Sequence, residues 1–313
     1  MNKHISTIFY LALLLVSAVL TGCIKEKGSD YCPTAAHYLI VRSFDADNKE
    51  ITGTGAVREV VLYVFDNNGA YTGKIIGAEN AHIPLDYPEG SQLTLVGWAN
   101  SQNGKQIMPQ LAQGTPIDQA LVTLTENSSQ PAAVPAGSKA SPQIGSSSAS
   151  PDDLFWGTGV VSLNSLEGQT EVGHELNIKR KVASISVVIK GLQEWAGTSD
   201  TDFSIVINGT RKSIDFRGNK VGNPTLYLHQ LLKNENGLFV TGIFNTFPSA
   251  DTRITIDVYK GSEKIYTVTT DGENKPFVLD EGRLLNVFID FTRNAAVTFT
   301  VTEWGKVDIN QDF

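Results

Sequence analysis

Cysteine and histidine are the residue types in this 313-residue sequence that most readily bind metal or act as nucleophiles. The histidines show no metal-ligand spacing such as H-E-x-x-H, because they lie far apart in the chain. They are His4, His37, His82, His174 and His229. Two cysteines, Cys23 and Cys32, are too few for a thiolate zinc site. We therefore predict no metal site and interpret the histidines as solvated or structural.

Motifs for nucleophilic catalysis and for cofactor binding are missing as well. No serine occupies a G-x-S-x-G motif, and Gly157-Thr158-Gly159 lacks the third glycine of a dinucleotide site. Residues 45–50 begin like a calcium loop but lack its glycine at position six and its glutamate at position twelve, which favours a turn between strands. The pair Asp152-Asp153 has the carboxylates of a glycosidase, but a sequence does not fix the separation that this mechanism needs. We predict no catalytic residue, no cofactor and no enzyme activity.

Cys23 is the residue whose surroundings predict definite chemistry. Lys3 and an apolar run over residues 8–20 precede it, and the small residues Thr21 and Gly22 come directly before it. A basic start, a short apolar core and small residues before the cleavage point are typical of a secretory signal peptide. The apolar run is shorter than the ~20 residues that a membrane span needs. The alternative is an ordinary secretory signal that happens to end near a cysteine.

The residues Leu20-Thr21-Gly22-Cys23 resemble the lipobox of bacterial lipoproteins. The resemblance implies that residues 1–22 are removed and that Cys23 carries an S-diacylglycerol group and an N-acyl chain such as palmitate. About two acyl chains suffice for stable anchoring, so this modification would hold the protein firmly on a membrane. Cys32 would then have no partner for an internal disulfide, and we interpret it as incidental rather than reactive.

The charge of the chain excludes some classes of partner. Removal of Lys3 with the signal leaves 24 basic residues against 33 acidic ones. An acidic protein without a basic run is a poor ligand for nucleic acid or for an anionic membrane surface. Attachment to a membrane would therefore come from the acyl chains.

The elements that follow the signal are mostly strands. Residues 23–36 are polar and unpatterned, which is typical of a flexible tether, and residues 126–151 form a Ser/Pro-rich loop. Residues 226–232 are the one segment that favours a short helix. Apolar or alternating runs that predict strands cover residues 38–44, 60–65, 70–76, 92–100, 121–124, 175–178, 182–189, 253–259, 285–291 and 297–302. We predict an all-β protein with two successive β-sandwich domains, over residues 37–168 and 169–313.

Several stretches, taken in order, resemble the FimB-type fimbrial anchor subunits of Bacteroidales, which belong to type V pili. The resemblance runs from about His37 to the C-terminus. With the lipobox, it rests on residues 61–66, 68–69, 96–100, 153–157 and 179–183.

The resemblance implies two tandem transthyretin-like β-sandwiches and a place in the outer membrane, held by lipid on Cys23 and exposed at the cell surface. It also implies a structural role at the base of a fimbrium, where the anchor holds the fibre and limits its length. The expected partners are fimbrial shaft subunits, and the expected contact is strand addition at an open sheet edge.

Two alternatives stay open. Shaft or accessory fimbrillins have a similar architecture and are cut behind a basic residue, and Arg42 and Lys49 lie near the corresponding place. Arg42, however, falls inside a predicted strand. The other alternative is a surface glycan-binding lipoprotein, in which Trp195 and Trp304 would face a sugar.

Overall fold

A computed structural model describes residues 35–127, 146–249 and 253–305. Nearly all of the regular structure in these ranges is β-strand, which confirms the predicted all-β class. The short helical elements are η1 (Ile117–Gln119), α2 (Leu192–Trp195) and η2 (Phe291–Arg293). The signal peptide, Cys23, all but the end of the tether and most of the Ser/Pro-rich loop lie outside the described residues.

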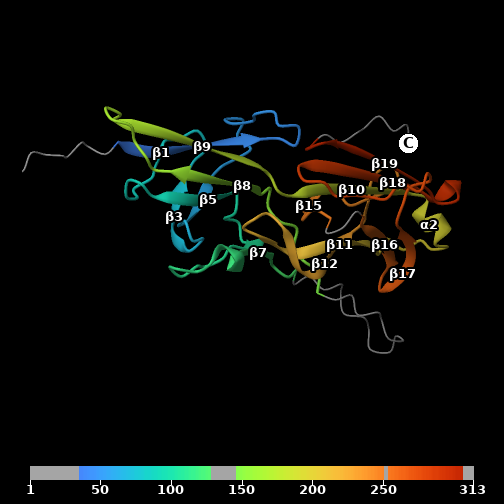
Figure 1. Ribbon diagram of the computed structural model, residues 1–313. Helices are drawn as coiled ribbons and strands as arrows, with labels where there is room; N and C mark the ends of the chain where they lie inside the picture. Colours follow the sequence, from blue (N-terminus) through green and yellow to red (C-terminus); the bar gives the residue numbers. More distant parts are fainter. Residues whose placement is uncertain (1–34, 128–145, 250–252, 306–313) are drawn as a thin grey trace, which may run out of the picture.

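The first sheet folds over on itself to make a sandwich. Its strands, in spatial order, are β3 (Tyr71–Gly77), β2 (Val60–Phe65), β5 (Gln92–Ala99), β8 (Phe155–Ser162), β9 (Glu171–Arg180), β1 (Ala36–Phe44) and β4 (Ile83–Pro84). β8 and β9 pair only through residues 155–156 and 179–180. Beyond that short ladder the two strands diverge, so β9 and β1 lie as a layer over β8 and β5 (Figure 1). β1 and β9 run parallel and pair over nine residues.

A second sheet belongs to the C-terminal half of the chain. Its path is β13 (Leu232–Lys233), β14 (Phe239–Val240), β10 (Ala183–Lys190), β18 (Arg283–Asp290) and β19 (Ala296–Glu303), and β15 (Phe244–Thr246) also pairs with β10. β10 and β18 are parallel, whereas β19 is antiparallel to β18 and forms one edge.

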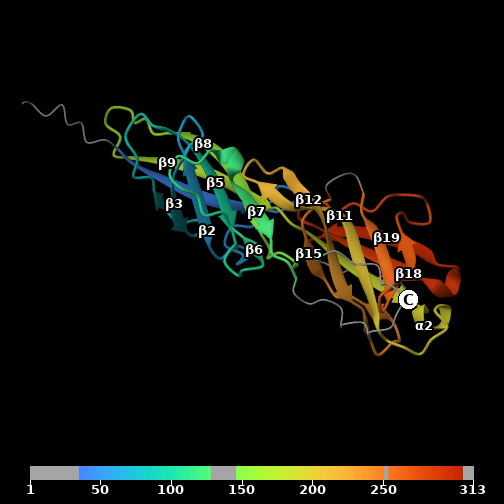
Figure 2. The same cartoon turned by 90° about the horizontal axis from the view of Figure 1, so that it is seen from below.

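The third sheet, here named the shared sheet, contains strands from both halves. Its path is β17 (Glu263–Val268), β16 (Thr255–Lys260), β11 (Phe203–Asp215), β7 (Leu121–Leu124) and β6 (Gln106–Ile107), and β12 (Lys220–Gln230) pairs with β11. β11 pairs with β16 through residues 203–208 and with β7 through residues 213–215. The shared sheet therefore lies beneath both the first and the second sheet in the view of Figure 1, and Figure 2 shows the molecule from that side.

Two hydrophobic cores result from these three sheets. All six residues of β2 are buried because both faces of this strand are covered. Successive side chains of a strand point to opposite faces, so they enter two different cores. Val60, Leu62 and Val64 face a core inside the first sandwich, whereas Val61, Tyr63 and Phe65 face a larger core that continues over the shared sheet.

Phe216, directly after β11, joins the first sandwich to the shared sheet. Its ring contacts Tyr63 at a centroid distance of 4.8 Å, and Phe65 and Trp98 at 6.1 Å each. Because Phe216 has no solvent exposure, this aromatic cluster is part of the larger core.

Several predicted boundaries differ from the structure. The helix predicted at residues 226–232 is wrong, because most of that segment belongs to β12. This strand pairs with β11, and its Tyr227 side chain is buried. The predicted division between residues 168 and 169 falls just before β9, which pairs with β1 and β8. That boundary does not coincide with a break between sheets, and two separate, transthyretin-like domains stay a prediction.

Candidate functional site

The described part of the chain begins just ahead of β1. Cys23 and Cys32 lie outside the described residues, and β1 begins at Ala36. The backbone N–H of Ala36 donates to the Thr170 carbonyl at 2.9 Å, which is the first bond that joins β1 to the segment leading into β9. Any pull on residues 23–35 would thus reach the body through the parallel β1–β9 ladder.

Two histidines meet at this end of the molecule. His37 Nδ1 lies 3.0 Å from His174 Nε2, and His37 Nε2 lies 3.2 Å from a carboxylate oxygen of Glu89. Burial and the neighbouring His37 lower the pKa of His174. Glu89 also accepts hydrogen bonds from the backbone N–H and the hydroxyl of Ser165, so the arrangement ties together four segments of the first sandwich.

The other described histidines contact aromatic side chains of the body. His82 stacks on Tyr38 with ring centroids 4.1 Å apart, and His229 stacks on Phe244 at 3.5 Å. In the described ranges, no group of three or more His, Cys, Asp or Glu side chains is arranged to hold a metal ion.

The adjacent carboxylates of Asp152 and Asp153 have separate structural partners. Asp152 accepts a hydrogen bond from the Gln106 side-chain amide at 3.0 Å. Asp153 accepts two hydrogen bonds from Arg180, at 2.6 and 2.9 Å. Each carboxylate is therefore engaged in its own contact within the body.

Arg180 also explains the environment of Trp304. The guanidinium carbon lies 4.5 Å from the centroid of Trp304 and 4.7 Å from that of Phe155, so the cation is held between two rings. Trp304 thereby covers a buried charge. Trp195, the other tryptophan considered for sugar binding, stacks on Phe291 at 4.3 Å and remains 43% exposed.

The stretch 45–50 is a turn, as its sequence favoured. Asp45 Oδ1 accepts hydrogen bonds from the backbone N–H groups of Asp47 and Lys49, at 2.9 Å each. Asp47 forms an ion pair with Arg283 of β18. The turn therefore links the first sandwich to the second sheet.

Arg42, one of the two basic residues near a possible cleavage point, lies within β1 and is paired. Its guanidinium contacts Glu50 at 3.0 Å and Glu175 at 3.1 Å. Glu175 lies on the neighbouring strand β9. The contacts of Arg42 therefore help to hold β1 in the first sandwich.

β19 is an edge strand of the second sheet, and near its start it also bonds to a neighbouring loop, where the Gly272 N–H donates to the Val297 carbonyl at 2.9 Å. It pairs with β18 and with no other described strand, and its eight residues contain no proline, glycine or lysine. Natural edge strands are usually protected by such residues, because an unprotected edge pairs with other chains. Two other edges carry a lysine: Lys74 on β3 and Lys264 on β17. Val301 adds a side chain that is 47% exposed.

Sequence reasoning missed this edge because strand order cannot be read from the apolar pattern of a single strand. The run at residues 297–302 predicted a strand, but only the pairing with β18 shows which of its sides is open. Among the described residues, no helix is long and apolar enough to cross a membrane.

Comparison with known proteins gives consistent matches over most of the chain. The family model described as "Fimbrillin-A associated anchor proteins Mfa1 and Mfa2" matches residues 29–310. A relative named "Major fimbrium anchoring subunit FimB" from Porphyromonas gingivalis is 29% identical over 335 residues, with 99% of each chain covered. A second of that name, from the W83 strain, is 29% identical over 331 residues, with 98% of each covered.

A solved structure has the same fold. The fimbrial anchor protein Mfa2 from Porphyromonas gingivalis superposes with a TM-score of 0.58 at 14% sequence identity, over 86% of this chain and 98% of that one.

Proposed function

Because the chain belongs to the family of fimbrillin-A associated anchor proteins, we propose that it is an outer-membrane lipoprotein that holds a fimbria at the cell surface. The observation that carries this proposal is the match of the family model to residues 29–310, together with end-to-end similarity to a fimbrium anchoring subunit. The role is structural, with fimbrial shaft subunits as partners and without a catalytic step.

Lipid on Cys23 would supply the attachment to the membrane. The thiol would carry a diacylglyceryl group, and the new amine, exposed when residues 1–22 are removed, would be acylated. Residues 23–35 would then connect the lipid to β1, whose parallel ladder with β9 spans nine residue pairs. The chains stabilise the attachment through the ~0.8 kcal/mol that each buried methylene contributes.

The contact with the fimbria would be strand addition at β19. An extended segment of a shaft subunit would pair with the backbone groups along the open side of this strand. Support comes from the sequence of β19, which has no proline or lysine to prevent pairing, and from the exposed Val301. A subunit fixed by lipid suits the base of a fibre and, by ending assembly there, would limit its length.

The shaft alternative requires removal of the N-terminal segment by cleavage near Arg42 or Lys49. Cleavage behind Arg42 would cut inside β1 and break the contacts of this residue with Glu50 and Glu175. The pairing of Arg42 therefore counts against cleavage at this residue in the folded chain.

The direct test of the lipid attachment replaces Cys23 by alanine in fimbriated cells. We expect C23A to release most fimbriae into the medium, because the acyl chains are lost. The matched control is Cys32→Ala, which removes the other cysteine and should retain fimbriae as the wild type does. The measurement is the ratio of fimbrial protein in the medium to that on sedimented cells. Equal retention by C23A and C32A would contradict the proposal.

A further inference from the structure

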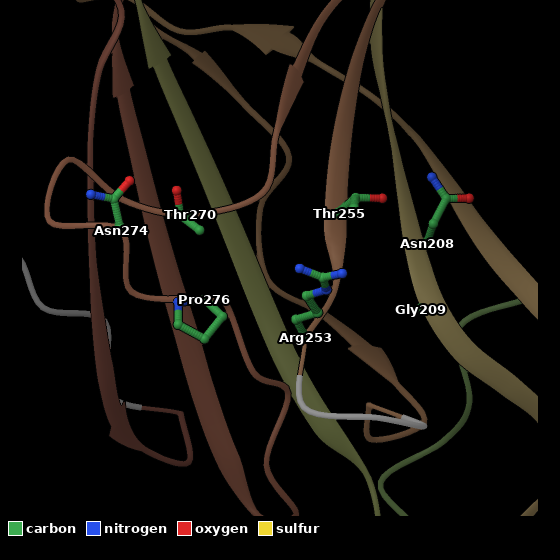
Figure 3. Close-up of a pocket in the computed structure, with 7 residues that line it drawn as sticks. All are labelled: Asn208, Gly209, Arg253, Thr255, Thr270, Asn274 and Pro276. Carbon is green, nitrogen blue, oxygen red and sulfur yellow. The ribbon is translucent and has the colours of Figure 1, made fainter.

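A polar hollow lies on the shared sheet, next to the turn between Thr270 and Pro276; the Gly272 N–H of this turn donates to the Val297 carbonyl of β19 at 2.9 Å. The volume of the hollow is about 670 Å³, and Figure 3 shows the Arg253 side chain between Thr255 and Asn208 on one side and Asn274, Thr270 and Pro276 on the other. Asn208 and Thr255 are direct cross-strand neighbours of β11 and β16. They alternate with residues that enter the larger core, so their side chains lie on the opposite face of the sheet.

The backbone at Gly209 forms one wall of the hollow. Its φ is +106°, and a Cβ at this position would lie 2.8 Å from the Arg253 carbonyl oxygen and 3.0 Å from the Ile254 Cα. Only glycine fits this approach without displacing backbone atoms. The close contact fixes the start of the Arg253 side chain relative to β11.

The opposite wall is a turn that is held in place by hydrogen bonds within the turn itself. Asp271 Oδ1 accepts hydrogen bonds from the backbone N–H groups of Glu273, at 2.9 Å, and Lys275, at 2.8 Å. Asn274, between them, has a φ of +64° and donates its backbone N–H to the Asp271 carbonyl at 3.1 Å. The conformation that presents the Asn274 amide is therefore set in advance, which lowers the entropy cost of binding.

The side chains that line the hollow indicate which class of ligand would fit it. They consist of one guanidinium, two amides and two hydroxyls, with the Pro276 ring as an apolar surface and no carboxylate. Arg253 is exposed, and no carboxylate of the described residues forms an ion pair with it, although the whole chain carries a formal charge of −8. A guanidinium pairs two N–H groups with one carboxylate, and amides and hydroxyls both donate and accept hydrogen bonds, as sugar hydroxyls require.

We propose that this hollow binds a sugar residue that carries a carboxylate, of the uronic acid or sialic acid type. Arg253 pairs with the carboxylate. Thr255, Thr270 and Asn274 hydrogen-bond to the ring hydroxyls, and Pro276 packs against a C–H face of the ring. Asn208 offers its amide oxygen, because its amide nitrogen donates to Asp257 at 3.0 Å. Binding of an acidic glycan is an adhesive function additional to anchoring, and it does not use β19 or Cys23.

The test uses the full chain, purified in detergent, and three free sugars in isothermal titration: glucuronic acid, N-acetylneuraminic acid and, as the neutral counterpart of the first, glucose. We expect saturable binding of at least one acidic sugar and at least about tenfold weaker binding of glucose, because a charge-assisted hydrogen-bond pair is lost. The acidic sugar that binds identifies which of the two types fits. Equal binding of glucose and both acidic sugars, or no saturable binding, would overturn the proposal.

Two variants and a control place the site. Arg253→Gln should lower the affinity about tenfold or more, and Asn274→Gly should lower it several-fold while keeping the urea midpoint, because glycine accepts the positive φ. Arg58→Gln removes an exposed arginine from the first sandwich and should leave the affinity unchanged. Wild-type affinity in R253Q, or the same loss in R58Q, would overturn the assignment. Cells carrying R253Q should still retain fimbriae, so failure of glycan binding and failure of anchoring are separate results.

Discussion

At the scale of single residues, partly buried histidines connect the stability of the body to pH. His229 lies on β12, accepts or donates one hydrogen bond with the Ser150 hydroxyl at 3.2 Å and stacks on Phe244. Burial lowers its pKa from 6.5 to about 4. The folded protein therefore resists protonation of this ring, whereas the unfolded chain takes up the proton near pH 6.5.

The expected result is a loss of stability in mild acid. The contribution of neutral His229 is complete above pH 6.5 and decreases as the pH falls towards 4, by about 3 kcal/mol in total. The lowered pKa of His174 acts in the same direction. His229→Gln should flatten part of this dependence, as measured by urea unfolding at pH 7.5, 6 and 5. His82→Gln, which changes an exposed ring, should keep the wild-type slope; an equal slope in H229Q and the wild type would refute the role of His229.

Contacts between side chains that are far apart in the sequence could not be predicted from the sequence alone. His37 and His174 are 137 positions apart, and their meeting depends on the parallel register of β1 and β9. Likewise, nothing local to Trp304 indicates that it would cover Arg180. The sequence did correctly identify residues 45–50 as a turn, because the Asp45 side chain caps it through local hydrogen bonds.

At the scale of elements, a strand was predicted correctly where it contains a run of buried apolar residues. The runs at residues 60–65 and 121–124 coincide with β2 and β7, since their apolar residues fill the cores directly. The strand β12 was not predicted, because nearly all of its residues are exposed or half-buried and its sequence contains Gly222, Pro224 and several polar residues. It forms a strand through its pairing with β11. Tertiary hydrogen bonding thus overrode a weak local pattern.

The proposed subunit contact leads to a prediction about β19. Val301→Lys places a charge on its exposed edge, where edge lysines prevent pairing in natural sheets, so fimbriae should detach several-fold more readily. The folded body should lose little stability, because the side chain is already half exposed. The measurement is cell-bound against released fimbriae after shear.

The matched control is Ile76→Lys on β3, another edge strand with an exposed aliphatic residue. I76K should retain fimbriae as the wild type does. Release by I76K with normal retention by V301K would assign the contact to the first sheet instead of the second.

At the scale of the whole molecule, β11 makes the two halves of the chain dependent on each other. One strand pairs with β16 of the C-terminal half and with β7 of the N-terminal half, and Phe216 at its end packs against Tyr63 and Trp98. The sequence predicted two successive sandwiches because each half has its own apolar runs. It did not reveal the shared sheet, since strand pairing between distant segments leaves no periodic signal.

Separate parts of the molecule would carry out separate tasks. The lipid would attach ahead of β1, the fimbrial subunit would pair at β19, and the acidic sugar would bind at Arg253 on the shared sheet. Figure 1 shows β1 and β19 in opposite halves of an elongated body, so a load between membrane and fibre would pass along its length.

The measurement that tests the central claim most directly is the position of this chain on intact fimbriae. Gold-labelled antibody against residues of the folded body should mark each fibre once, at the end next to the cell, and the protein recovered with the fibres should keep the residues from Cys23 onward. Labels repeated along the shaft, on a protein whose N-terminus lies beyond Arg42, would contradict the assignment as the anchor.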